Sequence, residues 1–226
     1  MITANVYNRV FFIKAADYGT AFAIDHGGKQ YLVTAKHLVN AEKQETIKFF
    51  FDRRWIDISV ELTGLCKGET DIAVFRANQI LCTKGFPLEP SSNGVVISQD
   101  VFFVGYPYKM WTDAGKAMNG RPCPFVKKGI LSSSFMGDDG IPRLYIDALN
   151  NPGFSGGPIV FQPPGKAEYK IAGVVSKFRI ELERVIDPQG DHTEMTVAYN
   201  TGFLMGYDIS KAIEIIERNP NGFPMP

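Results

Sequence analysis

The sequence predicts an all-β protein made of two six-stranded antiparallel β-barrels, with one α-helix near the C-terminal end. Three observations support this fold class. Short runs rich in Val, Ile, Phe and Tyr recur along the chain between turn-forming residues, a pattern typical of barrels or sandwiches. A segment rich in Pro, Gly and Ser, residues 84–94, divides these runs into two groups of six, which fits two small barrels. A helical pattern occurs only near the C-terminal end.

The first group of runs predicts the N-terminal barrel. Its clearest strand covers residues 55–62, where apolar side chains stand at every second position, the period of a half-buried strand. Residues 25–29, Asp-His-Gly-Gly-Lys, predict a hairpin turn between two of the runs. The six predicted strands are 6–14, 20–25, 30–35, 47–51, 55–62 and 71–75.

The second group predicts the C-terminal barrel, with strands at 101–105, 126–132, 144–148, 158–161, 169–178 and 196–204. Two long stretches, 106–124 and 181–194, show no periodicity and are expected to be exposed loops. Loops at a barrel rim either influence substrate choice or serve only as solvated connectors, and the sequence does not decide between these roles.

The C-terminal helix is expected at residues 211–218, because four apolar residues between 209 and 216 share one helical face. Asp208 can cap its start, and residues 219–222 end it. We therefore expect three parts along the chain. They are an N-terminal barrel at 1–86, the linker and C-terminal barrel at 87–208, and the helix and tail at 209–226.

Composition narrows the possible partners. The chain has 226 residues, and its 24 basic and 24 acidic side chains give a net charge of zero. This balance gives no indication of binding to nucleic acid or to a membrane surface. The longest apolar block near the N-terminus, residues 10–13, is too short for a signal peptide, and no run is long enough to span a membrane. The sequence as given therefore predicts a cytoplasmic location.

The cysteines and histidines give no indication of a metal or a disulfide framework. Cys66, Cys82 and Cys123 are odd in number and show no C-x-x-C spacing, so we expect three small buried apolar residues. A single bridge between two of them remains open at this stage. The three histidines lie far from any cysteine pair, and we expect neither zinc nor another cofactor.

The most informative segment is residues 150–160, Asn-Asn-Pro-Gly-Phe-Ser-Gly-Gly-Pro-Ile-Val. It places Ser155 in a glycine-rich turn directly before an apolar run. The glycines allow a tight turn that leaves the hydroxyl exposed, as a nucleophile requires. The N–H groups of Gly153 and Ser155 would then converge on one small concavity, which suits an oxyanion. Serine is also common in ordinary turns, so this motif alone is only moderately specific.

Two further residues strengthen the catalytic interpretation. His37 stands at the end of a β-branched apolar run, and Asp71 stands at the start of another. Neutral imidazole is the usual base for a serine hydroxyl, and a carboxylate fixes its tautomer. Taken singly, His37 could be an ordinary strand-end histidine and Asp71 a turn or cap residue. The order His, Asp, Ser, each in its expected local context, favours a catalytic triad.

Four segments resemble the chymotrypsin-like (trypsin-like) serine peptidases, most closely the HtrA/Deg-type protease domain without PDZ. They are residues 19–24, 32–37, 71–74 and 151–158, and the likeness extends from about Gly19 to Met205. The resemblance implies that His37 is the general base, Asp71 the orienting carboxylate and Ser155 the nucleophile. It also implies that Gly153 is an oxyanion-hole donor.

Three positions depart from the family pattern. Lys36 precedes His37, where alanine is common in the family; neighbours in a strand point to opposite faces, so Lys36 need not reach the site. Phe154 precedes Ser155 in place of a small or polar residue. Phe154 cannot pair with a newly cut N-terminus, so the resemblance gives no support to activation by N-terminal cleavage. Ala21 stands where a second glycine is common and should stiffen that loop.

The resemblance also indicates where the substrate pocket should lie. Its walls would come from the segment before Ser155 and from a later strand. None of the corresponding residues is acidic, which favours an aliphatic or aromatic substrate side chain over Arg or Lys, unless Lys177 turns inward and favours an acidic one. The expected pocket residues are Leu149, Ala172, Gly173, Val174, Val175 and Ser176.

The sequence therefore predicts a serine endopeptidase, a hydrolase of polypeptide substrates that uses His37, Asp71 and Ser155. The alternative is a binding module that keeps the protease fold but is catalytically silent. A related possibility is an enzyme that becomes active only when a partner binds. Lys36 and Phe154 support the silent module, because a distorted serine turn would separate the three residues in space. The natural substrate and the oligomeric state stay open.

Overall fold

The first barrel is closed by six antiparallel strands. The computed structural model describes residues 1–40, 43–83, 85–137 and 140–226, without the side chains of 116 and 117, so residue 84 of the predicted linker lies outside the description. The strands pair in the order β3-β2-β1-β4-β5-β6, and β3 also pairs with β6. Their bounds are β1 Val10–Lys14, β2 Tyr18–His26, β3 Lys29–Thr34, β4 Thr46–Phe51, β5 Arg54–Leu65 and β6 Ala73–Ala77.

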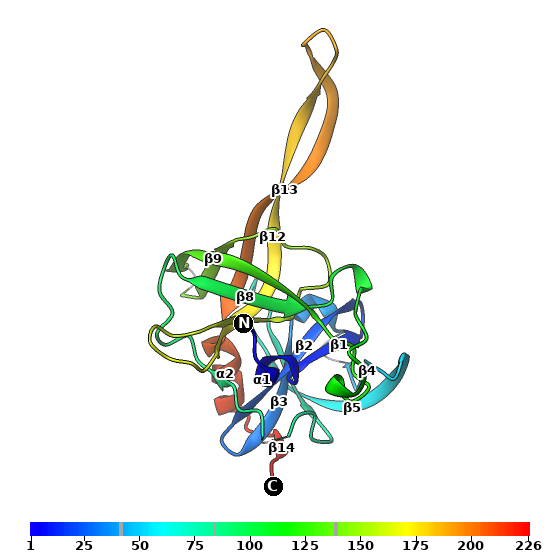
Figure 1. Ribbon diagram of the computed structural model, residues 1–226, viewed down its shortest axis with the longest axis vertical. Coiled ribbons are helices and arrows are strands. Elements are labelled where there is room, and N and C mark those ends of the chain that lie inside the picture. Colours follow the sequence, from blue (N-terminus) through cyan, green and yellow to red (C-terminus); the bar gives the residue numbers. More distant parts are fainter. Residues whose placement is uncertain (41–42, 84, 138–139) are drawn as a thin grey trace.

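The second barrel is closed in the same way, so the expected pair of six-stranded barrels is confirmed (Figure 1). Its strands pair in the order β11-β8-β9-β10-β13-β12, and β11 also pairs with β12. A short strand, β7 (Glu89–Pro90), adds to β12 in parallel. The bounds are β8 Asp100–Gly105, β9 Phe125–Met136, β10 Pro142–Asp147, β11 Pro158–Phe161, β12 Lys170–Ile186 and β13 His192–Asp208.

The C-terminal segment returns to the first barrel. Helix α2 (Ser210–Arg218) follows β13, and the Asp208 carboxylate accepts the N–H of Ser210 at 2.8 Å, as expected of a residue that caps the start. Ile215 of this helix packs against Gly64, where an added Cβ would lie 2.7 Å from the Ile215 side chain. Strand β14 (Phe223–Pro224) then pairs with β3. The chain end therefore fastens the second barrel onto the first.

Three apolar clusters explain why the strands assemble in this way. One fills the first barrel, with Phe49 and Phe75 among its members, and another fills the second, with Phe103 and Phe161. Alternation along each strand places these side chains inside, since successive residues of a strand point to opposite faces. The third cluster lies between the barrels and also contains residues of α1 (Ala4–Tyr7) and α2. Burial of this shared cluster fixes the position of one barrel on the other.

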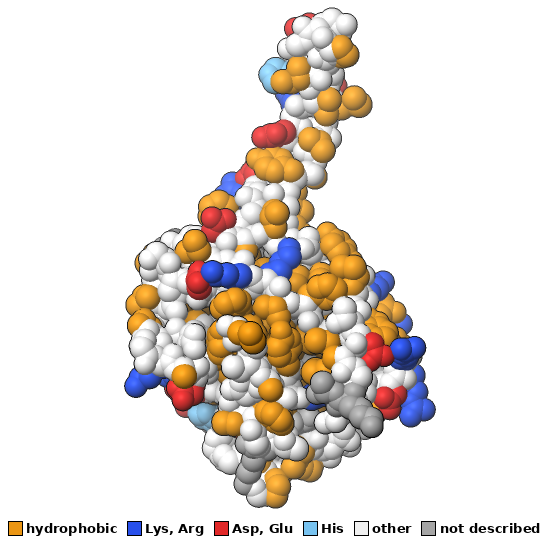
Figure 2. Space-filling model, in the orientation of Figure 1, with side chains coloured by type: hydrophobic (Ala, Val, Ile, Leu, Met, Phe, Trp, Pro, Cys, Tyr) orange, Lys and Arg blue, Asp and Glu red, His pale blue; other side chains and the backbone are white. Residues whose placement is uncertain are grey.

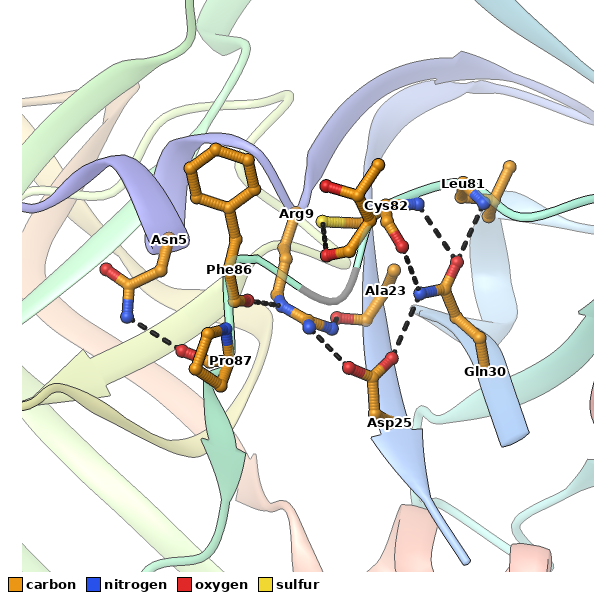
Figure 3. Close-up of polar contacts among 10 residues, drawn as sticks. Asn5, Arg9, Ala23, Asp25, Gln30, Leu81, Cys82, Phe86 and Pro87 are labelled. Carbon is orange, nitrogen blue, oxygen red and sulfur yellow. Dashed lines mark hydrogen bonds and ion pairs between the residues drawn. The ribbon is translucent and has the colours of Figure 1, made fainter. Parts of the chain in front are cut away.

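A polar cluster holds the crossing from the first barrel to the second (Figure 3). The Arg9 side chain is fully buried, forms an ion pair with Asp25, and donates to the Phe86 carbonyl at 2.7 Å. The Gln30 amide donates to the Asp25 carboxylate at 2.9 Å and to the Cys82 carbonyl at 2.8 Å. Because a buried guanidinium needs partners for its donors, this network fixes the positions of residues 81, 82 and 86.

The sequence analysis was wrong about the stretch 181–194. This stretch is not a loop: β12 and β13 continue through it as a two-stranded ribbon that projects from the second barrel (Figure 1). We call residues 179–200 the arm. The arm does carry a two-residue alternation that the sequence analysis overlooked: Ile180 and Leu182 alternate with Glu181 and Glu183, and a similar pattern follows at residues 195–199. Both faces of the arm are exposed, so this alternation marks extended strands that do not lie against a core.

Smaller differences concern the N-terminus and the long loop. Residues 4–7 are helical, where an extended run from residue 6 was expected. The stretch 106–124 contains two 3₁₀ turns, Pro107–Lys109 and Gly115–Met118, and a single bridge between Thr112 and Cys123. All three cysteines are free, which leaves no bridge of the kind the sequence had left open. In the described ranges, no helix has the length and apolar character needed to cross a membrane.

Candidate active site

His37 lies on a short 3₁₀ turn, Lys36–Leu38, directly after β3. The apolar residues of β3 anchor this turn in the first barrel, while the His37 side chain stays half-exposed. Its Nδ1 lies 2.7 Å from Asp71 Oδ2, and its backbone N–H donates to Asp71 Oδ1 at 2.9 Å. A carboxylate acceptor requires Nδ1 to carry the hydrogen, which leaves the Nε2 lone pair free to accept a proton.

Asp71 lies just before β6 and is largely buried, with 13% of its side chain exposed. It accepts a third hydrogen bond, from the Ser176 hydroxyl at 2.6 Å. Burial acts to raise the pKa of Asp71, but the hydrogen bonds from His37 and Ser176 outweigh it, and the pKa is lowered. Asp71 is therefore an ionised carboxylate near neutral pH, as an orienting group for imidazole must be.

Ser155 lies in the turn before β11 and contacts the same serine. Its hydroxyl donates to the Ser176 carbonyl at 3.0 Å, and its own carbonyl accepts the N–H of Thr20 at 3.0 Å. Across the part of the chain that the structure describes, no hydrogen bond joins the Ser155 hydroxyl to His37. Ser176 thus contacts both residues: its carbonyl accepts from Ser155 of the second barrel, and its hydroxyl donates to Asp71 of the first.

Two glycines allow this turn to form. Gly153 has φ +106°, and a Cβ added there would lie 2.2 Å from the Tyr106 carbonyl oxygen. Gly156 has φ +78°, and its Cβ would lie 2.2 Å from the Thr20 carbonyl oxygen. Only glycine combines the left-handed backbone with such close approach. The requirement for glycine beside Ser155, expected from the sequence, thus has a direct steric cause.

The peptide groups around Gly153 are held by three hydrogen bonds. The Tyr108 N–H donates to the Pro152 carbonyl at 2.8 Å, and the Thr20 hydroxyl donates to the Gly153 carbonyl at 2.7 Å. The Phe154 carbonyl accepts the N–H of Gly157 at 2.9 Å. The C=O and N–H of one trans peptide point in opposite directions. A carbonyl that is held by a hydrogen bond therefore also fixes the direction of the N–H in the same peptide group.

The N–H groups of Gly153 and Ser155 are the ones expected to form the oxyanion hole. Each follows a carbonyl that is held in place, those of Pro152 and Phe154. Within the described residues, neither N–H donates to another protein group. Both donors are therefore oriented by the surrounding structure and free to bind an external oxygen.

The residues that depart from the family pattern are accommodated without disturbing the site. Phe154 is fully buried in the second barrel, where its ring meets Phe103 edge-on at 4.9 Å between centroids. Lys36 turns away from His37 and donates to the Gly68 carbonyl at 2.7 Å. Ala21 is buried in the first barrel. The aromatic ring of Phe154 thus anchors the serine turn through core packing.

The predicted pocket residues separate into three groups. Leu149 is 58% exposed and borders a cavity of about 360 Å³, together with Pro152 and Phe178. Ser176 lies at the site itself, against Asp71 and Ser155. The prediction needs correction for the remaining residues, Ala172, Gly173, Val174 and Val175.

Ala172 and Val175 face the interior of the second barrel, Val174 faces the cluster between the barrels, and none of the four residues borders a described cavity near Ser155. Ala172, Val174 and Val175 are fully buried in the apolar clusters. A Cβ at Gly173 would lie 2.5 Å from the Tyr207 carbonyl oxygen, so no space is left beside it. The sequence marked the correct strand, but of the five residues predicted on it only Ser176 lies at the candidate site.

Sequence analysis missed the contacts that orient the site. Ser176 was expected only as a pocket residue, and neither Thr20 nor Tyr108 was considered. Thr20 is fully buried, and its hydroxyl also accepts the N–H of Tyr106 at 3.2 Å. A buried hydroxyl needs partners, but the burial of Thr20 follows from the packing of the barrels and gives no signal in the sequence.

Comparison with known proteins identifies the family. Residues 19–165 match the family model described as a trypsin-like peptidase domain. This match covers more than half of the chain and contains all four residues from which the site was built, Gly153 and the three of the predicted triad. The chain belongs to the trypsin-like peptidase family. A search of curated proteins found no match.

Solved structures of bacterial proteases share the fold of this trypsin-like domain. The active form of Rv3671c protease from M. tuberculosis is 15% identical, with a TM-score of 0.60 over 99% of this chain and 86% of the other. The serine endoprotease from Yersinia pestis is 19% identical, with a TM-score of 0.57 over 96% and 67%. The HtrA-type protease AlgW with tripeptide is 21% identical, with a TM-score of 0.57 over 95% and 60%.

The shared fold does not separate active from inactive arrangements. The inactive form of Rv3671c protease aligns with a TM-score of 0.58 at 16% identity, over 96% of this chain and 91% of the other. The side-chain geometry of this chain must therefore carry any argument about activity.

Among the described residues, no group of three His, Cys, Asp or Glu side chains is placed to hold a metal ion.

Proposed function

We propose that this trypsin-like domain is a serine endopeptidase, with Ser155 as nucleophile, His37 as general base and Asp71 as orienting carboxylate. The observation that carries the proposal is the bonding of Asp71. Its carboxylate accepts from His37 Nδ1 at 2.7 Å and from the hydroxyl of Ser176, whose carbonyl binds the Ser155 hydroxyl at 3.0 Å. Base, carboxylate and nucleophile thus belong to one connected hydrogen-bond network.

The proposed reaction begins with a movement of the Ser155 side chain. Rotation about its Cα–Cβ bond releases the hydroxyl from the Ser176 carbonyl and turns it toward His37 Nε2, which takes the proton as the oxygen attacks the substrate carbonyl. The oxyanion forms against the N–H groups of Gly153 and Ser155, a type of contact worth about 3 kcal/mol of barrier per donor. His37 then gives its proton to the leaving amine, and water hydrolyses the acyl-enzyme by the same steps.

A fluorophosphonate probe tests this proposal directly, because it reacts with an activated serine. We expect labelling at Ser155 and cleavage of an unfolded protein substrate. Ser155→Ala should lose both while keeping the thermal unfolding temperature. Ser134→Ala, an exposed serine on β9, is the matched control and should retain both. Proteolysis that persists in the Ser155→Ala protein would remove the mechanism.

A second candidate is a binding module with the same fold, either silent or activated by a partner. The observation that favours it is the Ser155 hydroxyl, which binds the Ser176 carbonyl instead of His37. The probe separates the cases. Prompt labelling supports the enzyme, labelling only after an unfolded polypeptide is added supports the activated form, and no labelling at any pH supports the silent module.

A further inference from the structure

The cavity of about 360 Å³ beside the serine turn has no role in the chemistry proposed so far. One wall is the segment that leads into this turn and includes Pro152, the residue before Gly153. Another wall includes Phe178 of β12, two residues after Ser176, whose carbonyl accepts the Ser155 hydroxyl. A side chain that enters this cavity therefore belongs to a substrate residue bound next to Ser155.

The same cavity lies at the base of the arm. Figure 2 shows the arm standing clear of the rest of the molecule, with apolar side chains along its surface. Ile180 and Asn200, which are paired across β12 and β13 where the arm begins, both border the cavity. Its apolar members, such as Leu149, Phe178 and Ile180, can pack against the methylene groups of a substrate side chain.

One charged side chain borders this cavity in the described ranges, that of Lys127 near the start of β9. Its Nζ donates to the Leu149 carbonyl and to Asn151 Oδ1, both at 2.5 Å. It also lies 5.8 Å from the centroid of the Phe154 ring, beside Ser155 in sequence. An ammonium group has three hydrogens, so one donor is left after these two bonds. The cation is thus held in place with capacity for one further acceptor.

Lys127 lacks a counter-charge. Its ammonium forms no ion pair with a carboxylate of the described residues, and no Asp or Glu borders the cavity among them. Partial burial lowers the pKa of Lys127, because the charged form is less well solvated. By contrast, the next residue, Lys128, is more exposed and pairs with Asp100 at 2.8 Å. A cation that is partly removed from water favours a ligand that brings the missing negative charge.

Two uncharged donors border the same cavity. Asn150 is 1% exposed, and its side-chain Nδ2 has no hydrogen-bond partner in the part of the chain that the structure describes. The Tyr108 hydroxyl accepts from Asn151 Nδ2 at 3.0 Å, and within the same part of the chain its own hydrogen has no acceptor. Buried polar groups are rarely left unpaired. Donors together with one positive charge suit a carboxylate, which accepts through both oxygens.

The positive charge comes from a strand that the sequence did not indicate. Lys177, the cation that the sequence offered for this role, does not border this cavity. It borders instead a cavity of about 640 Å³, together with Tyr145 of β10 and Phe203 of β13. The contact of Lys127 with Leu149 depends on the closure of the second barrel, so it has no local signature.

We propose that Lys127 makes the site specific for acidic residues. The aspartate or glutamate side chain of the residue whose carbonyl Ser155 attacks enters the cavity, and its carboxylate accepts the third hydrogen of the Lys127 ammonium. A basic side chain is repelled there, and an apolar one leaves the donors without partners. This inference rests on the proposed peptidase function, and it names the class of peptide bond that the site cleaves.

Peptides that differ only at the residue before the cut test this preference. That residue is Glu, Asp, Gln, Leu or Lys, and both peptide ends are blocked, so the side chain supplies the only carboxylate that changes. We expect kcat/KM for the better acidic peptide to exceed that of the Gln peptide by about 30-fold or more, because a charge-assisted bond is lost. The Lys peptide should be the poorest. A Gln or Leu peptide that is cleaved as well as both acidic ones overturns the proposal.

Replacement of Lys127 by methionine separates specificity from a structural role. Lys127→Met keeps the length of the side chain but removes its charge, so the ratio of kcat/KM for the Glu and Gln peptides should fall to about threefold or less. Lys127→Arg should keep a clear preference for Glu. Lys128→Met removes the same charge from the neighbouring residue and should leave the ratio unchanged. If Lys127→Met slows cleavage of every peptide equally and keeps the ratio, Lys127 only holds the segment before the serine turn, and the proposal is wrong.

A binding measurement keeps this inference separable from the proposed function. In the Ser155→Ala protein, fluorescence anisotropy of a labelled Glu peptide should give a dissociation constant about tenfold or more below that of the Gln peptide. Adding Lys127→Met should abolish the difference. If the wild-type protein cleaves none of the peptides but this preference is present, only the peptidase proposal fails. If it cleaves none of them and the two peptides bind equally, or neither binds, this inference fails as well.

Discussion

Thr20 lies in the first barrel, and its replacement by valine should impair the proposed oxyanion hole in the second barrel. The Thr20 hydroxyl is fully buried, donates to the Gly153 carbonyl at 2.7 Å and accepts the N–H of Tyr106 at 3.2 Å. Valine keeps the size and the branched shape but removes both bonds. The Gly153 carbonyl is then no longer tied to the first barrel, and the peptide that follows Gly153 can rotate.

The magnitude follows from the two groups left without partners. A buried donor or acceptor without a hydrogen bond costs about 1–3 kcal/mol, so the two groups together lower the unfolding free energy by about 2–6 kcal/mol. The Gly153 N–H belongs to the preceding peptide, whose Pro152 carbonyl stays bonded to the Tyr108 N–H. If the rotation is transmitted through Gly153 to that peptide, part of one oxyanion contact is lost. Since such a contact is worth about 3 kcal/mol, we expect kcat to fall by about 10- to 100-fold.

Steady-state kinetics and urea unfolding measure these two effects separately. Thr20→Ser is the matched control, because it keeps the hydroxyl and loses only a methyl group, and it should retain kcat within about threefold. For Thr20→Val, kcat should fall while KM changes little, since the oxyanion forms only in the transition state. A Thr20→Val protein that is less stable but has unchanged kcat would refute the positioning role.

Three further predictions concern the second barrel and Asp71. Ser176→Ala removes a hydrogen bond that lowers the pKa of Asp71, so the acid limb of the pH profile of kcat/KM should move to higher pH, and kcat should fall about tenfold. Asp71 has a lowered pKa in the folded protein, so its contribution to stability is complete above its unfolded pKa of about 4 and is lost as the pH falls through the folded value. Chemical unfolding of Asp71→Asn should therefore differ from wild type at pH 7 and converge with it in acid. Phe154→Ala should lower the unfolding free energy by about 3–5 kcal/mol, measured by urea titration, because it empties a fully buried ring site against Phe103.

The barrel strands could be predicted because their interiors impose a clear pattern. The run 158–161 was placed at the bounds that the structure gives to β11, and 47–51 begins one residue after β4 starts. All residues of β11 are buried, and Ile47 and Phe49 of β4 are buried, so the apolar residues in these strands are the ones that face a core. Local sequence therefore carries most of the information where a strand lies against a core.

The outer part of the arm was missed because no core lies against it, although residues 196–200 fall within a predicted strand. Between Ile180 and Tyr199 no core selects one face, and apolar and charged side chains occur on both. Strand pairing there depends on backbone hydrogen bonds between β12 and β13 and on a turn at Asp187–Asp191, where the Asp187 N–H donates to the Asp191 carbonyl at 2.9 Å. Each strand of the arm alternates over a few residues, but the pairing of the two strands places apolar side chains on both faces of the ribbon.

The candidate site was predictable in its residue types but not in its supporting contacts. The glycines at 153 and 156 could be identified from the sequence because a tight turn beside an exposed serine favours glycine. The structure gives both residues the positive φ that such a turn requires. By contrast, the role of Ser176 depends on where β12 emerges from the barrel, and that of Thr20 on how the barrels pack together. Contacts across 105 and 133 residues of sequence are set by tertiary structure and have no local signature.

Each barrel supplies a hydroxyl that positions a residue of the proposed site in the other barrel. Ser176 of the second barrel donates to Asp71 of the first, and Thr20 of the first donates to Gly153 of the second. The Thr20 N–H also holds the Ser155 carbonyl at 3.0 Å. Because these bonds run in both directions, a small shift of one barrel would disturb the carboxylate, the nucleophile turn and the oxyanion donors together. The apolar cluster between the barrels therefore supports the proposed chemistry together with the side chains of the site, since its packing helps to keep both hydroxyls within reach of their partners.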